Sequence, residues 1–279
     1  MYTLCAFSDE ADPSLQGQIA ALRDNGISYM EIRGIDGKNI ADISVAESKE
    51  IKKQLDDSGL TVWSIGSPSG KIQIDDPFVP HLDSFKHMLE LAHILEASHY
   101  RLFSFYGTDG RLDRENAVLE RLSAFLKAAK GSGICLCHEN EKGIYGDIAG
   151  RCVRIHEALP ELKAIFDPAN FIQCNQNSYE AFLLLKPYIE YIHIKDALPN
   201  GTIAPAGHGE GAIPQILAET AGRNYMLTIE PHLHVFDGLK ALEEDGNTSH
   251  VGAYAYETPR KAFDEAVKAL TGVLADIGQ

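Results

Sequence analysis

The chain has few cysteines, no long apolar run and no basic leader, and each of these absences excludes a class of protein. Its 5 cysteines in 279 residues are odd in number and too few for a disulfide framework, which favours reduced thiols and a cytoplasmic protein. No apolar stretch reaches the length that a membrane-spanning helix needs. The opening MYTLCAFSDE lacks a basic segment and carries Asp9 and Glu10, so we expect no signal peptide.

Positive charge is also scarce in this sequence. The 25 Lys and Arg residues face 40 Asp and Glu residues, which gives a formal net charge of −15. A surface of this sign repels the phosphates of nucleic acids and of anionic lipids, so we expect neither nucleic acid nor a membrane as a partner. The acids are dispersed along the chain, as expected of an ordinary solvated surface.

Strand-like and helix-like segments alternate eight times. The strand-like segments are short, apolar and rich in β-branched or aromatic residues, as is typical of strands buried on both faces. They cover 2–7, 28–33, 60–66, 99–105, 133–138, 162–166, 189–194 and 225–230. This alternation predicts an α/β protein, a (β/α)8 TIM barrel that takes residues 1–279 as a single domain. A doubly wound sheet is the alternative, but it normally has a Gly-rich turn where this chain has SDEADPS.

Capping signals mark the ends of several predicted helices. Asp12-Pro13 opens the first helix, Ser44 and Glu47 form a capping box, and Thr258-Pro259 opens the last helix. Further helices are expected at about 77–97, 113–131, 147–159, 178–186 and 212–221. Cys135 and Cys137 lie on one face of a predicted strand, where we expect them to pack as small apolar side chains.

The longest irregular segment, 231–257, follows the last predicted strand. A loop of this length in a compact barrel usually has a function, such as a lid or an oligomer contact, and a surface excursion is the alternative. Homo-oligomers are common among barrels of this kind, but the sequence leaves the oligomeric state open.

Four of the predicted strands end in side chains that bind metal ions. These side chains are Glu139 after ICLCH, Asp167 after AIF, His193 in YIHIKD and Glu230 after LTI. Successive members are separated by about 30 residues, the length of one strand–helix–strand unit. Because the carboxyl ends of barrel strands meet at one face, we expect the four side chains to converge there. Three carboxylates and one imidazole suit one divalent ion: Mn²⁺, Mg²⁺, Co²⁺ or Zn²⁺.

These stretches resemble the sugar phosphate isomerase/epimerase superfamily, the xylose isomerase-like barrels. The resemblance covers essentially the whole chain and is carried by YMEIRG, GSPSGK, HENEKGIYGD, FDPAN, HIKD, GHGEG and IEPH. The superfamily includes ketose 3-epimerases, inosose isomerases and dehydratases, hydroxypyruvate isomerase and endonuclease IV. The resemblance implies that Glu139, Asp167, His193 and Glu230 bind a divalent metal ion, with Mn²⁺ expected first. It also implies that Glu139 and Glu230 are the catalytic acid/base pair on a carbohydrate or polyol.

The sequence departs from the ketose 3-epimerases at two positions. Asn170 stands three residues after Asp167, where those enzymes usually carry a histidine that touches the substrate. Tyr145 stands six residues after Glu139, where they often have a glutamate. Both departures favour a different branch of the superfamily.

Polar residues at the strand ends and in the following loops are candidates for binding the substrate. We select Lys195, Asn170, Arg33, His208, Glu210, Lys71 and His232. Each has a purely structural alternative. Lys195 has Asp196 or another acid as an alternative partner, Arg33 has Glu10 or Glu31, and His208 and Glu210 fit a plain polar turn. His232 is favoured over His234 because its position has the same parity as Glu230.

These features predict a divalent-metal-dependent sugar or polyol isomerase or epimerase. The enzyme would remove a proton next to a carbonyl through a metal-stabilised ene-diolate. An inosose-type dehydratase, a lyase with the same metal site, is the alternative. An endonuclease IV-like phosphodiesterase fits less well, because it needs many histidines and a basic face. A non-catalytic carbohydrate-binding barrel also fits less well, because all four candidate ligands are present.

Overall fold

The computed structural model describes residues 2–234 and 254–279, so most of the predicted loop 231–257 lies outside the described residues. Eight parallel strands close into a barrel in the order β1-β12-β9-β8-β7-β6-β5-β2. Their bounds are β1 Thr3–Ala6, β2 Tyr29–Ile32, β5 Thr61–Ile65, β6 His99–Leu102, β7 Cys135–Glu139, β8 Lys163–Phe166, β9 Ile189–Ile194 and β12 Met226–Ile229. All eight coincide with expected strand segments, so the predicted TIM barrel is confirmed. The doubly wound alternative is wrong, because β1 pairs with both β12 and β2.

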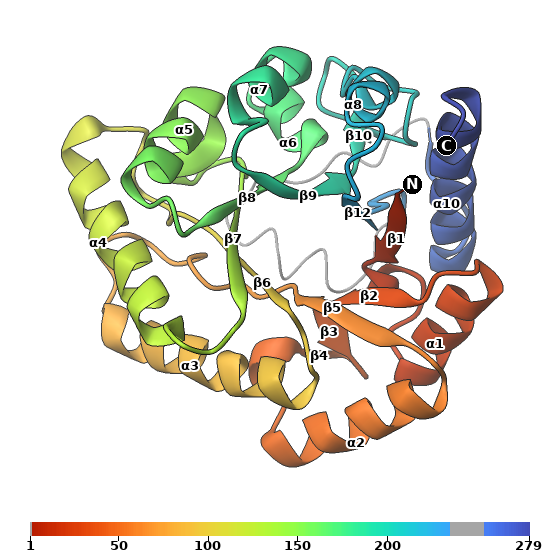
Figure 1. Ribbon diagram of the computed structural model, residues 1–279, viewed down its shortest axis with the longest axis horizontal. Coiled ribbons are helices and arrows are strands. Elements are labelled where there is room, and N and C mark those ends of the chain that lie inside the picture. The colour runs from red at the N-terminus through yellow and green to blue at the C-terminus, as the bar shows by residue number, and fades with distance from the viewer. Residues whose placement is uncertain (1, 235–253) are drawn as a thin grey trace.

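Helices form an outer ring around the strands (Figure 1). Their bounds are α1 Leu15–Asp24, α2 Val45–Asp57, α3 Phe78–Ile94, α4 Leu112–Ala129, α5 Ala149–Ala158, α6 Pro168–Gln173, α7 Ser178–Leu185, α8 Ile213–Glu219 and α10 Pro259–Asp276. Short 3-10 helices are η1 Ser8–Glu10, η2 Ile40–Asp42 and η3 Tyr145–Asp147. Two small antiparallel pairs complete the described elements: β3 Gly34–Ile35 with β4 Lys38–Asn39, and β10 Asp196–Ala197 with β11 Ile203–Ala204. None of the described helices is long and apolar enough to cross a membrane.

The helix caps agree with the sequence except at the first helix. The capping box of Ser44 and Glu47 and the Thr258 cap are both present. The first helix, however, begins two residues later than predicted, with Ser14 in place of Asp12 as its N-cap. Asp12 instead accepts hydrogen bonds from the backbone N–H and hydroxyl of Ser14, which orients that cap. The short helix α6 was not expected from the sequence.

The interior of the barrel changes from apolar to charged along the strands. A cluster of buried side chains fills the part of the barrel further from the carboxyl ends of the strands: Cys5, Cys137, Ile165, Tyr191 and Met226. Because side chains alternate along a strand, the positions two residues further on also face inward. Several of these positions carry charged groups, including Glu139 after Cys137 and His193 after Tyr191. The carboxyl end of the barrel is therefore the polar end.

Candidate metal centre

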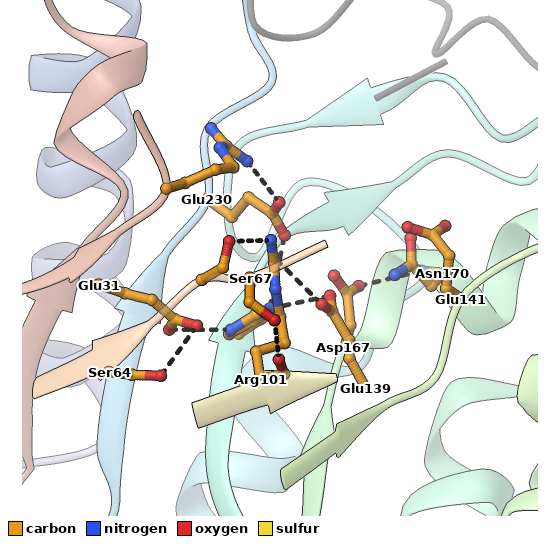
Figure 2. Close-up of polar contacts among 12 residues, drawn as sticks. Glu31, Ser64, Ser67, Arg101, Glu139, Glu141, Asp167, Asn170 and Glu230 are labelled. Carbon is orange, nitrogen blue, oxygen red and sulfur yellow. Dashed lines mark hydrogen bonds and ion pairs between the residues drawn. The ribbon is translucent and has the colours of Figure 1, made fainter. Parts of the chain in front are cut away.

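Glu139, Asp167, His193 and Glu230 converge at the carboxyl ends of the barrel strands. One ligand atom from each lies within 4.8 Å of the ligand atoms of the other three, and all four residues are buried. They come from β7, from the end of β8, from β9 and from the end of β12. Figure 2 shows the carboxylates of Glu139, Asp167 and Glu230 turned toward a common centre.

Asp167 is fixed by the turn that joins β8 to α6. It is the N-cap of α6, and its Oδ1 accepts the backbone N–H of Asn170 at 3.0 Å. Asn140 holds the same turn from the end of β7: its Nδ2 donates to the Asp167 carbonyl and its Oδ1 accepts the Asp167 N–H, each at 2.9 Å. Asn170 returns a hydrogen bond to the Asn140 carbonyl, also at 2.9 Å. These bonds lock the two strand ends together.

The imidazole of His193 is held between carboxylates on both sides. Its Nδ1 lies 3.0 Å from Glu139 Oε1 and 3.6 Å from Glu230 Oε2, so this nitrogen faces the cluster. Its Nε2 lies 3.1 Å from Oε2 of Glu31 on β2. The other oxygen of Glu31 accepts hydrogen bonds from Tyr191 at 3.0 Å and Ser64 at 3.3 Å. The ring orientation is therefore determined by the barrel interior.

Three buried cations balance the acids. Arg101 on β6 donates to Glu139 Oε2 at 3.1 Å and to the Gly66 carbonyl. Arg33, after β2, contacts Glu230 Oε1 at 3.2 Å. Lys195 Nζ lies 2.8 Å from Asp167 Oδ2 and 3.1 Å from Glu230 Oε2. A buried charge is costly unless it is paired, so these three cations make the burial of the carboxylates in the folded protein possible.

The surroundings shift the proton affinities of these groups in opposite directions. Burial raises the pKa of Asp167 to about 7, although Lys195 opposes that shift. Burial alone would also raise the pKa of Glu230, but the charge of Lys195 and the neighbouring His232 and His193 bring it well below its usual value. Burial would lower the pKa of His193, but Glu139 and Glu31 raise it well above the usual value. Two carboxyl groups of one cluster thus differ strongly in acidity.

The remaining sequence candidates lie at different depths. Lys71 Nζ lies 3.2 Å from Glu141 Oε2 and sits over the Phe103 ring, at the margin of the cluster. His232 is buried, and its Nε2 lies 3.5 Å from Glu230 Oε1. His208 and Glu210 are exposed on the loop after β11.

The structure also shows the partners of Arg33 and Tyr145. Arg33 pairs with Asp9 and Glu10 in addition to Glu230. Tyr145 is buried, and its hydroxyl donates to Glu115 on α4 rather than entering the cluster.

The GHGEG turn serves the side chain of Asp196. Oδ2 of Asp196 accepts the backbone N–H groups of Gly207 and Gly209 at 2.9 and 3.1 Å, and Oδ1 accepts that of Gly211 at 2.8 Å. A Cβ at Gly209 would lie 2.3 Å from the Ala197 carbonyl oxygen, so only glycine fits there. Asp196 therefore anchors this loop, and Lys195 beside it is left to the acids of the cluster.

Sequence reasoning missed several residues of the site. Glu31 lies in β2, two residues before Arg33, and Arg101 lies in β6, two residues before Phe103. Glu141 follows β7 and contacts Lys71. The available signal was the alternation of side chains along a strand. Residues two apart point to the same face, so Glu31 faces the same side as Arg33, and Arg101 the same side as Phe103. Asn140 gave no signal of its own, since its role depends on a contact with the next strand.

The arrangement of the four residues fits a divalent metal ion. Three carboxylates and one imidazole present buried ligand atoms within 4.8 Å of one another. The ammonium group of Lys195 already lies among two of these carboxylates, which shows that the site attracts positive charge. Oxygen ligands with one nitrogen suit Mn²⁺, Mg²⁺, Co²⁺ and Zn²⁺.

Solved structures of low sequence identity share this fold along their whole length. A probable 3-DHS dehydratase, AsbF, from Bacillus anthracis has a TM-score of 0.74 at 15% identity, covering 97% of this chain and 98% of its own. The IOLI protein, solved with a bound zinc atom, has a TM-score of 0.74 at 14% identity, covering 98% of each chain.

A D-psicose 3-epimerase from Clostridium cellulolyticum H10 has a TM-score of 0.69 at 16% identity, covering 98% of each chain. No curated protein matches the chain. Residues 19–250 match the sequence profile of a family described as "Xylose isomerase-like TIM barrel". With its closed eight-stranded barrel and the converging acids and histidine, the chain belongs to the xylose isomerase-like TIM barrel family.

Proposed function

We propose that this protein is a divalent-metal-dependent isomerase or epimerase of a sugar or polyol that moves a proton next to a carbonyl group. The convergence of Glu139, Asp167, His193 and Glu230 in one buried cluster carries the proposal. The fold also resembles a D-psicose 3-epimerase and a zinc-bound protein. We expect Mn²⁺ first, with Zn²⁺, Co²⁺ and Mg²⁺ as alternatives.

Glu139 and Glu230 are the proposed acid/base pair. Each carboxylate is paired with a different cation, Glu139 with Arg101 and Glu230 with Arg33 and Lys195. For Glu230, burial would raise the pKa, but the charge of Lys195 and the neighbouring His232 and His193 lower it well below its usual value, and this favours the ionised form that a general base needs to remove a proton from carbon. A divalent ion bound among the four residues would stabilise the negative charge that develops on the substrate oxygens. The glutamate that removed the proton can return it to the neighbouring carbon, which gives the isomer. Donation to the opposite face, which gives the epimer, requires the other glutamate to carry a proton taken from solvent beforehand.

Lys195 is the proposed contact to a substrate oxygen. Lys195 is 5% exposed, and its ammonium group lies between Asp167 and Glu230. A cation in that position can donate a hydrogen bond to an alkoxide or enolate oxygen as charge develops there. We propose that Lys71 and His232 border the same substrate, while Arg33 orients Glu230. Asn170 supports the turn that carries Asp167.

A dehydratase is the second candidate. Loss of water needs a proton donor for the leaving hydroxyl group in addition to the base that removes the first proton. The ammonium group of Lys195, which lies beside Asp167 and Glu230, offers such a donor. The similarity of the fold to a probable 3-DHS dehydratase supports this candidate equally. A phosphodiesterase is disfavoured by the net charge of −15 and by the single histidine among the four ligands.

Proton exchange with solvent tests the proposal. The Mn²⁺-loaded protein is incubated in D₂O with ketoses, aldoses and inososes, with and without chelator, and followed by NMR. Chelator-sensitive deuterium uptake next to a carbonyl, with a rearranged product, supports the isomerase. Deuterium uptake followed by loss of water replaces it with the dehydratase. Absence of exchange on every compound, with metal demonstrably bound, counts against proton-transfer chemistry on these substrates.

A further inference from the structure

A second group of metal-binding side chains lies at the opposite end of the barrel. His99 begins β6, Cys135 begins β7 and Glu190 lies near the start of β9. One ligand atom from each lies within 4.8 Å of those of the other two. Cys135 and Glu139 stand at the two ends of β7, so the groups are separated by about 13 Å along that strand.

The side chains of this second group are held in place from several sides. Nδ1 of His99 lies 2.7 Å from the hydroxyl oxygen of Ser98, which leaves Nε2 facing Glu190 at 3.4 Å. The Trp63 ring stacks on the imidazole, with ring centroids 3.9 Å apart. Metal-binding histidines are typically oriented in this way, with one nitrogen hydrogen-bonded and the other presented to the ion.

Cys137 is the candidate for a fourth ligand, next to Cys135 but outside the group of three whose ligand atoms all lie within 4.8 Å of one another. Its Sγ lies 3.8 Å from Sγ of Cys135 on the same face of β7. Two thiolates on a tetrahedral Zn²⁺, each at about 2.3 Å, stand about 3.8 Å apart.

The group is reachable from solvent. Cys135 is partly exposed, and 37% of the Glu190 side chain is accessible, while His99 and Cys137 lie deeper. An ion can therefore enter from the amino-terminal face of the barrel without passing the cluster at the carboxyl ends. Nothing in the proposed reaction uses these four residues.

We propose that Cys135, His99 and Glu190, with Cys137 as a fourth ligand, form a second metal site selective for Zn²⁺ and similar thiophilic ions. The ligand chemistry separates it from the first site. Sulfur and imidazole ligands favour Zn²⁺ over Mg²⁺ and Mn²⁺, whereas the cluster of three carboxylates and one imidazole accepts all of them. The second site binds its ion whether or not the first site is catalytic.

Titration with Co²⁺ distinguishes the two sites, because a thiolate bound to Co²⁺ gives a sulfur-to-metal charge-transfer absorption that oxygen and nitrogen ligands do not give. The full-length protein, stripped of metal and fully reduced, is titrated while absorption and bound metal are measured. The wild type is expected to bind two equivalents, with a charge-transfer band that saturates at one equivalent. Addition of Zn²⁺ should abolish the band, whereas Mg²⁺ should leave it.

Variants assign the band to these residues. Cys135→Ser and the more exposed Glu190→Gln are each expected to lose one equivalent together with the band. Asp167→Asn should keep the band, and Cys174→Ser, at a partly exposed cysteine outside the group, should keep both equivalents. Retention of the first equivalent shows that a variant is folded. A wild-type protein without the band at Co²⁺ saturation overturns the proposal, as does a band that persists in Cys135→Ser.

Discussion

Nε2 of His193 lies 3.1 Å from Oε2 of Glu31, and both side chains are fully buried. This contact, from β9 across to β2, turns the other ring nitrogen toward Glu139 and Glu230. A carboxylate behind a metal-binding histidine fixes the ring and increases the basicity of the nitrogen that meets the ion. We therefore propose that Glu31 is a positioning residue for the candidate metal centre, although it lies on the far side of the imidazole.

Replacing Glu31 with glutamine should weaken metal binding while leaving the fold intact. Glutamine has nearly the same shape and keeps an oxygen for Tyr191 and Ser64, but it removes the charge that faces His193. We expect the dissociation constant for Mn²⁺ to rise about 10–100-fold, as is usual for such partners. Calorimetric titration measures this, with the exposed Glu120→Gln as the matched control. Unchanged affinity in Glu31→Gln would show that the contact has no role in metal binding.

Replacing Lys195 with methionine should destabilise the metal-free protein. The ammonium group neutralises Asp167 and Glu230, and its loss leaves buried carboxylates without a partner. We expect a loss of about 3–5 kcal/mol in unfolding free energy, partly restored by Mn²⁺. Denaturant unfolding with and without Mn²⁺ tests this. Lys186→Met, which removes a half-exposed pair with Glu219, should cost less than about 1 kcal/mol. Equal losses in the two variants would contradict the role given to Lys195.

Alanine at Gly209 should destabilise the protein, whereas the same change at Gly150 should not. The new Cβ at Gly209 would lie 2.3 Å from both the Ala197 carbonyl oxygen and Asp196 Oδ1. We expect a cost of about 1–3 kcal/mol from the forced shift. Gly150 lies in α5 with nothing within 4 Å of its Cβ position, so alanine there should add about 0.5–1 kcal/mol through helix propensity. Thermal unfolding of both variants compares them, and equal effects would refute the packing argument.

The stability of the protein should fall in mild acid, with a contribution from His81. Burial lowers the pKa of His81 from 6.5 to about 4, and the Gly70 N–H donates to its Nε2 at 2.7 Å. Since the folded pKa lies below the unfolded one, the stabilisation is complete above 6.5 and is lost as the pH falls toward about 4. Because the side chain is partly exposed, the loss is about 2 kcal/mol, less than the full shift implies.

Comparison with a variant isolates this contribution. His81→Gln keeps an acceptor for Gly70 and cannot titrate, while the buried histidines His99, His138, His156, His193 and His232 stay in place. Denaturant unfolding at pH 7 and at pH 4.5 should show a smaller difference for the variant than for the wild type. Parallel losses in both proteins would show that His81 is not responsible.

The strands and the four candidate ligands were predictable because both follow from local pattern. Apolar runs mark strands buried on two faces, and their carboxyl ends meet in a barrel whatever the loops do. The convergence of Glu139 with Glu230 needed only the correct strand boundaries and the closed topology. The roles of the individual residues in catalysis stay predictions.

The rest of the site depended on contacts between distant segments. Glu31 meets His193 only after β2 and β9 face each other across the barrel, and a register irregularity between Met30 and Glu31 sets the alignment of Glu31 with Ser64. The GHGEG turn looked like a substrate loop, but its glycine N–H groups bind Asp196. The local sequence pattern predicts neither the contact between Glu31 and His193 nor the hydrogen bonds to Asp196, because both join segments that meet only in the assembled barrel.

The most direct test of the proposed proton transfer is solvent deuterium exchange by Glu230→Gln, compared with the wild type, once a substrate has been found. Both proteins are loaded with Mn²⁺, and bound metal is measured in the same samples. We predict that Glu230→Gln retains its metal but loses exchange at the carbon next to the carbonyl by about 100-fold or more, as expected for loss of a general base. Undiminished exchange by a metal-bound Glu230→Gln protein would contradict the assignment of Glu230 as an acid/base residue.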